Sequence, residues 1–239
     1  MIDRHIAKLR ARDELSSQEE DAIRAAVAEV RIYEPDLTVI RRAEQLTHST
    51  LLLDGFMCRY KDLSDGQRQI SELHVSGDFV DLHSFTLKYL DHDIMTLTPC
   101  RVALVPHEKL QEITEQHPHL ARLYWFLTNI DAAVHREWEL SLGRRSAVAR
   151  IAHLFCELQV RLCIVGMADD RGFELPLTQA ELAECSGLTA VHVNRSLKAL
   201  REDGLVEFRR SRVELRSLEK LRMLAEFDPM YLYVDRRRR

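Results

Sequence analysis

Five polar side chains near the C-terminal end of this chain share one face of a predicted helix. The segment that begins after Thr189 places Val193, Leu197 and Leu200 at helical spacing, so these three form an apolar face. The opposite face carries Thr189, His192, Asn194, Arg195 and Lys198. Side chains of these types can donate hydrogen bonds to base edges or phosphates, as a helix in the major groove of DNA requires.

A second predicted helix ends just before this one. Thr178 and Glu181 have the spacing of a capping box, which opens a helix. Gly187 follows at a position where a sharp turn requires a positive φ angle. Two short helices joined by such a turn predict a helix-turn-helix. The alternative is an ordinary helical hairpin whose polar face is only hydrated.

A predicted β-hairpin follows the second helix. Gly204 ends that helix, and two short runs of alternating apolar residues come next, at 205–208 and 213–215. Three basic residues that can reach backbone phosphates lie between the runs. They are Arg209, Arg210 and Arg212. A helix-turn-helix followed by a basic wing indicates DNA binding more specifically than either feature does alone. We therefore expect this part of the chain to bind DNA.

The distribution of charge agrees with this expectation. Residues 1–142 carry 16 Lys and Arg against 24 Asp and Glu, a net charge of −8. Residues 143–239 carry 18 against 14, a net charge of +4. The basic excess therefore lies in the part with the predicted helix-turn-helix, where the tail Arg236–Arg239 supplies four of the charges.

Several other functions are not expected. No run approaches the roughly 18 apolar residues that span a bilayer, and the polar N-terminus is no signal peptide. We therefore expect a cytoplasmic protein without a membrane partner. The five cysteines have no CxxC spacing, which favours reduced thiols. Motifs such as HExxH, GxSxG or a phosphate-binding glycine loop are absent, so we expect no enzyme, no metal and no cofactor.

Short runs of alternating character fill residues 33–106 and are separated by polar turns with Gly and Asp. The runs are 38–40, 49–53, 57–60, 69–74, 94–97 and 101–105. This pattern predicts an antiparallel β-barrel or roll. Ahead of it, Ser17 and Glu20 match a capping box and predict a helix that continues to about Val30.

A long helix is predicted after the roll. Pro118 is suited to its first position, and Gly143 is expected to break it. One apolar stripe would run about 35 Å along this helix. It could pack against the roll of its own chain or against the same helix of a second copy, and we expect a dimer interface. The stripe comprises Leu123, Leu127, Ile130, Val134 and Trp138.

The order of these elements resembles the Crp/Fnr superfamily of bacterial transcription regulators. The strongest local matches are Ser76-Gly-Asp-Phe-Val80 in the roll and the ten residues from Leu188 to Leu197 in the second helix. The resemblance implies an α+β protein with three parts. These are a cyclic-nucleotide-binding-like antiparallel β-roll sensor domain at 1–117, a dimerisation helix at 118–142 and a winged helix-turn-helix DNA-binding domain at 143–239.

The resemblance also implies partners and roles. Family members are homodimers that bind pseudo-palindromic double-stranded DNA, with half-sites about 34 Å apart, and RNA polymerase is expected as a further partner. The family's base-reading arginine falls on Arg195, which would bind guanine. Many relatives carry a glutamate where this chain has Val191, which could instead contact a thymine methyl, while His192 or Asn194 takes over polar readout. The residues that fit phosphate contacts are Thr178, Gln179, Thr189, Lys198 and the three wing arginines.

The sensor region departs from relatives that bind cyclic nucleotides. Those relatives hold the ligand's phosphate with an arginine, whereas the matching segments here contain Asp78, Asp81, Asp91 and Asp93. We therefore expect the roll not to bind cyclic AMP. The first 57 residues contain no cysteine for an iron–sulfur cluster.

The sequence leaves haem binding and a redox response as alternative inputs to the sensor domain. Haem would need ligands such as His74, His83 or His92, and Cys58 and Cys185 are candidates for a redox response. The alternative function is a ligand- or redox-gated module whose winged helix serves protein–protein interaction.

Overall fold

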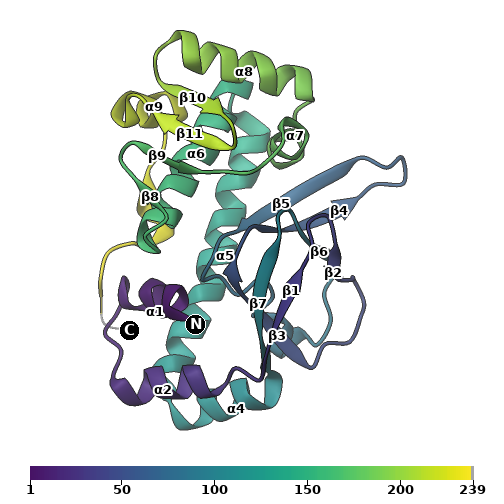
Figure 1. Ribbon diagram of the computed structural model, residues 1–239, viewed down its shortest axis with the longest axis vertical. Coiled ribbons are helices and arrows are strands. Elements are labelled where there is room, and N and C mark those ends of the chain that lie inside the picture. Colours follow the sequence, from purple (N-terminus) through teal and green to yellow (C-terminus); the bar gives the residue numbers. More distant parts are fainter. Residues whose placement is uncertain (238–239) are drawn as a thin grey trace. The chain divides into compact units, whose positions relative to one another are not determined.

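The computed structural model describes residues 1–237, which form two compact units (Figure 1). The first, here called the roll unit, comprises residues 1–61, 72–132 and the segment from Tyr233 onward. The second, here called the winged-helix unit, comprises residues 62–71 and 133–232. Arg238 and Arg239 of the basic tail lie outside the described residues.

The expected antiparallel roll is confirmed. One sheet has the strand order β1-β7-β3 and the other has the order β2-β6-β4-β5. The strands are β1 (Glu29–Tyr33), β2 (Thr38–Ile40), β3 (His48–Asp54), β4 (Met57–Asp62), β5 (Arg68–His74), β6 (Asp93–Thr96) and β7 (Cys100–Pro106). The central strand β7 pairs with β3 so that Leu51 lies opposite Ala103, and both side chains are buried. Six of these strands lie where the alternating runs predict them.

Strand β1 was not among the predicted runs. The expected helix covered its first residues, but helix α2 (Ser17–Ala25) ends earlier. The helix begins one residue before the predicted position, because Ser16 and Glu19 make the capping box that was expected from Ser17 and Glu20. As an edge strand, β1 exposes residues on both of its faces, with Ile32 74% exposed. Its residues alternate between polar and apolar, but Val30 also continues the helical spacing of Ile23 and Val27, so the spacing predicts a helix as far as Val30.

The remaining helices of the roll unit pack on the sheets. They are α1 (Asp3–Arg10), α3 (Ser84–Leu87), α4 (His107–Gln116) and the first part of α5 (Pro118–Arg144). Helix α1 contributes Ile6 and Leu9 to the same apolar core as Leu110 and Leu123. This burial of α1 was not predicted from the sequence.

Helix α5 runs past Gly143 and ends at Arg144. A glycine inside a helix costs only about 1 kcal/mol, which is less than the roughly 2 kcal/mol that a buried side chain such as Trp138 contributes. The helix thus ends one residue beyond the expected break at Gly143. Of the stripe expected at a dimer interface, Leu123, Ile130, Val134 and Trp138 are buried within their own chain, and Leu127 is half-buried.

The winged-helix unit is assembled around α6 (Ala147–Ile164), whose Phe155, Leu158 and Leu162 are fully buried. The other elements are β8 (Ala168–Asp169), β9 (Gly172–Glu174), α7 (Gln179–Ser186), α8 (Ala190–Glu202), β10 (Val206–Arg209), β11 (Arg212–Leu215), α9 (Leu218–Ala225) and the 3₁₀ helix η1 (Pro229–Leu232). Its sheet has the order β10-β11-β9-β8. No helix in residues 1–237 is long and apolar enough to cross a membrane.

Candidate nucleic-acid interface

The two helices of the predicted helix-turn-helix begin and end with local hydrogen bonds. The Glu181 N–H donates to Thr178 Oγ1 at 3.2 Å and the Thr178 N–H donates to the Glu181 carboxylate, which completes the capping box of α7. Gly187 ends α7 with a φ of 57°. Thr189 then caps α8 by accepting from the His192 N–H at 3.3 Å. The turn thus has the geometry that the sequence predicts.

Helix α8 separates an apolar face from a polar face. Val193 and Leu200 are fully buried and Leu197 is half-buried, so this face packs on the unit's interior. The residues of the opposite face are exposed. They are Thr189, Val191, His192, Asn194, Arg195 and Lys198, joined by Thr178 and Gln179 at the start of α7.

The polar face of α8 has few internal contacts. The Asn194 amide donates to Gln179 Oε1 at 3.4 Å, and Lys198 lies 3.7 Å from the carboxylate of Glu202. Within residues 1–237 no ion pair engages the guanidinium of Arg195. Because its charge is not neutralised by the protein, Arg195 is available to an acceptor outside the chain.

The wing is a tight hairpin between β10 and β11. Arg210 and Ser211 both have positive φ angles, as a two-residue type I′ turn requires. Two of the three predicted arginines are engaged by carboxylates, because Arg209 lies 2.7 Å from Glu207 and Arg212 lies 2.7 Å from Glu174. Exposed pairs of this kind contribute about 1 kcal/mol or less, so a phosphate can compete for these side chains.

The candidate redox cysteines are buried, and two of the candidate haem ligands lie near each other. Cys58 and Cys185 are buried, and none of the described cysteines forms a disulfide. The rings of His83 and His92 lie 5.5 Å apart. Across the part of the chain that the structure covers, no three His, Cys, Asp or Glu side chains are placed to hold a metal ion.

The aspartates of the roll have protein partners. Asp81 is fully buried and accepts from the Thr50 N–H at 2.5 Å, and burial raises its pKa to about 7. Asp78 accepts from a backbone N–H and pairs with Lys8. Asp91 lies 2.6 Å from Lys61, whose hydrogen bond holds the pKa of Asp91 well below its usual range. Asp93 accepts from a backbone N–H at 2.9 Å.

A buried arginine was missed by the sequence reasoning. Arg59 on β4 is 3% exposed, and its Nη1 lies 2.6 Å from Glu72 on β5. Its Nη2 lies 3.1 Å from Asp131 on α5, and its Nε donates to the Val80 carbonyl at 2.9 Å. The available signal was a charged residue inside the apolar run 57–60.

Two domain descriptions match this chain. Residues 149–224 match the Crp-like helix-turn-helix domain, and residues 30–117 match the cyclic nucleotide-binding domain. The first covers the helix-turn-helix and wing described above, and the second covers the roll.

Similar proteins align with about three quarters or more of this chain. A probable transcriptional activator of Rhizobium leguminosarum bv. viciae is 30% identical over 178 residues, which cover 74% of this chain and 72% of that protein. The transcriptional activator protein FnrL of Cereibacter sphaeroides is 29% identical over 181 residues, covering 74% and 71%. The solved structure of FixK2 from Bradyrhizobium japonicum has a TM-score of 0.75 at 26% identity, covering 83% of this chain and 97% of that one.

Proposed function

The chain belongs to the Crp/Fnr family of transcription regulators, and from this premise we propose that it binds a specific DNA sequence as a homodimer in the cytoplasm. The observation that carries the proposal is the exposed polar face of α8, which presents Arg195 without an internal ion pair. Members of this family regulate transcription and are not enzymes, which agrees with the expectation from the sequence.

The roles of the interface residues follow from their chemistry. Arg195 binds a guanine through two parallel hydrogen bonds, a contact that discriminates against other bases by about 1–3 kcal/mol. Val191 is 59% exposed and contacts a thymine methyl. The phosphate contacts come from the start of α7, Thr189, Lys198 and the wing, and they position the protein without reading sequence.

A face of α5 other than the predicted stripe supports the homodimer. Trp125 is 70% exposed, although aromatic side chains of this size usually bury much of their surface. Trp125 and the apolar Ala132 lie one heptad apart on this face. Polar residues continue the same exposed face at alternating steps of three and four residues. The exposed residues of this face are Arg122, Trp125, Asn129, Ala132, Arg136 and Glu139. We infer that this face, and not the buried stripe, meets the second copy.

The roll of this protein does not bind cyclic AMP in our proposal. Its aspartates already have protein partners, and an anionic phosphate would meet carboxylates there. The buried Arg59 does not offer an alternative, because Glu72 and Asp131 already lie within 3.1 Å of its guanidinium. A thermal-shift assay with cyclic AMP tests this point, and marked stabilisation would contradict it.

Similarity to proteins named as transcriptional activators supports activation as the outcome of binding. An activator that occupies a promoter needs to contact the transcription machinery, so RNA polymerase is the partner that we propose besides DNA.

Selection of genomic fragments by the purified protein tests the proposed function. The affinity for selected fragments should fall steeply as salt concentration rises, because phosphate contacts release counterions. Arg195→Ala should abolish the preference for the selected site and leave weak non-specific binding. Arg101→Ala removes an exposed arginine from the roll and serves as the control. Retention of full site preference by Arg195→Ala would refute the assigned readout, and no salt-dependent DNA binding by the wild type would favour the protein-interaction alternative.

A further inference from the structure

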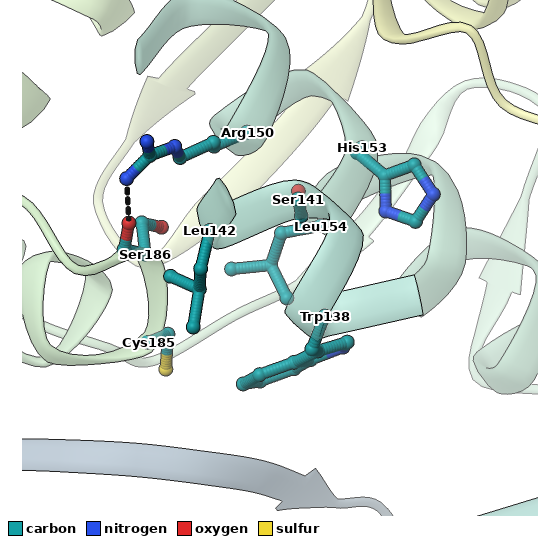
Figure 2. Close-up of a pocket in the computed structure, with 8 residues that line it drawn as sticks. All are labelled: Trp138, Ser141, Leu142, Arg150, His153, Leu154, Cys185 and Ser186. Carbon is teal, nitrogen blue, oxygen red and sulfur yellow. Dashed lines mark hydrogen bonds between the residues drawn. The ribbon is translucent and has the colours of Figure 1, made fainter. Parts of the chain in front are cut away.

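The turn between α7 and α8 is held by a side chain from outside the helix-turn-helix. The last carbonyls of a helix have no partner within it, and Arg150 on α6 supplies one. Its Nη1 donates to the Ser186 carbonyl at 3.1 Å and to the Gly187 carbonyl at 3.5 Å, and Figure 2 shows the first of these bonds. Its Nε donates to the Arg145 carbonyl at 3.0 Å. One guanidinium therefore joins the turn to the residue that follows α5.

A second side chain holds the same turn. Gln69 lies on β5, within the 62–71 segment of the winged-helix unit. Its Nε2 donates to the Glu184 carbonyl at 2.7 Å, which is one of the last carbonyls of α7. Its Oε1 lies 3.6 Å from the point where a side chain on Gly187 would begin. Arg150 and Gln69 thus donate hydrogen bonds to three carbonyls at the end of α7, those of Glu184, Ser186 and Gly187.

The inner side of the turn is closely packed. A Cβ on Gly187 would lie 2.9 Å from Leu142 Cδ2 on α5. A cavity of about 20 Å³, the space of roughly one water molecule, lies behind the turn and is lined by Trp138, Leu142, Arg150 and Cys185 among others (Figure 2). Since so little free volume remains, the position of the turn is fixed by contacts from α5, α6 and β5.

The turn sets the direction of α8. Arg195 lies six residues beyond Thr189, about 9 Å along the helix axis. A tilt of α8 by roughly 10° about its first residue would move Arg195 by about 1.6 Å, which is more than a bidentate hydrogen-bond pair tolerates. Long basic side chains that contact phosphates can adapt to such a shift. Loss of the turn's position should therefore weaken base readout more than non-specific binding.

We propose that Arg150 and Gln69 are positioning residues for sequence recognition: by holding the carbonyls of the turn, they fix the direction in which α8 presents Arg195. This inference rests on the proposed function, because it requires Arg195 to read a base. Neither residue is expected to touch DNA itself.

The test compares binding to a selected site with binding to unrelated DNA. Arg150→Ala and Gln69→Ala should each lower affinity for the selected site, by about tenfold for Arg150→Ala, which is within the range that one bidentate base contact supplies. Affinity for unrelated DNA should not change. Arg150→Lys should behave like Arg150→Ala, because a compact ammonium cannot bind the turn and the Arg145 carbonyl together. Arg144→Ala and Gln67→Ala are matched controls at neighbouring exposed positions.

A double mutant separates positioning from a purely structural role. If Arg150 acts through Arg195, adding Arg150→Ala to Arg195→Ala lowers the affinity for the selected site no further. Multiplicative losses, an equal loss on both DNAs, or unchanged site preference in Arg150→Ala and Gln69→Ala would overturn the inference. A wild type that prefers no site would instead overturn the proposed function.

Discussion

Replacement of Gly187 by alanine tests the packing of the turn directly. Two costs follow from the structure. The φ of 57° is left-handed, which costs an L-residue roughly 1–2 kcal/mol. The new Cβ also meets Leu142 Cδ2 at 2.9 Å, and moving the end of this half-buried side chain off its rotamer costs about 0.5–1.5 kcal/mol. Gly187→Ala should therefore lower the free energy of unfolding of the winged-helix unit by about 1.5–3.5 kcal/mol.

Gly204 provides the matched control. Its φ of 66° is also left-handed, but nothing lies within 4 Å of the position of an added Cβ. Gly204→Ala should therefore cost only the roughly 1–2 kcal/mol of backbone strain. Leu142→Ala removes the atom that the new Cβ meets. It should therefore recover part of the loss in the Gly187→Ala background and none in the Gly204→Ala background.

Urea unfolding followed by tryptophan fluorescence measures these differences. A common Trp125→Phe background leaves Trp138 as the single probe, and Trp138 is buried in the winged-helix unit. Equal losses for the two glycine variants, or no coupling between Gly187→Ala and Leu142→Ala, would refute the claim that close packing fixes this turn.

Three further predictions concern the roll unit and α5. Arg59→Ala should lower stability by about 3–5 kcal/mol in urea unfolding, since it removes the guanidinium that lies beside the buried carboxylate of Glu72; a loss below 1 kcal/mol would contradict this. Burial opposes the charge of His119, but hydrogen bonds to the carboxylates of Asp13 and Glu19 raise its pKa in the folded protein. Protonated His119 therefore stabilises the fold fully at pH values below its pKa in the unfolded chain, and this stabilisation is lost as the pH rises through its pKa in the folded protein. His119→Gln should accordingly cost stability near about pH 5.5 and little near about pH 8.5, and a pH-independent cost would count against the ion pairs. Trp125→Glu should convert the dimer to a monomer in light scattering, whereas an unchanged mass would exclude this face as the interface.

Much of the fold could be predicted because its signals are local. Alternating runs located β2 to β7, and the capping residues of α7 lie three positions apart. The failures are also local in origin. Ser16 and Ser17 are adjacent and each has a glutamate three residues on, so spacing cannot choose between the two capping boxes. Strand β1 alternates between polar and apolar residues, but Val30 also continues the helical spacing of Ile23 and Val27, so spacing cannot choose between helix and strand there.

The candidate interface could also be predicted because its pattern is local. The side chains that hold the turn before α8 could not be predicted. Apolar periodicity identified the polar face of α8, since the two faces of one helix follow from one short segment. Arg150 and Gln69 gave no signal, because Gln69 binds the end of a helix that lies 115 positions later in the chain.

The sequence by itself determined the helix-turn-helix, its basic wing and strands β2 to β7 of the roll, since capping, turns and periodicity depend on residues a few positions apart. Only the tertiary structure decided which face of α5 is buried, which carboxylates bind Arg59 and which side chains hold the turn before α8. These outcomes depend on packing between segments that are distant in the sequence. The apolar stripe of α5 shows this, because its spacing fits packing against its own chain and packing against a second copy equally well. The residues that we propose to read DNA are thus visible in the sequence, and the residues that we propose to aim them are not.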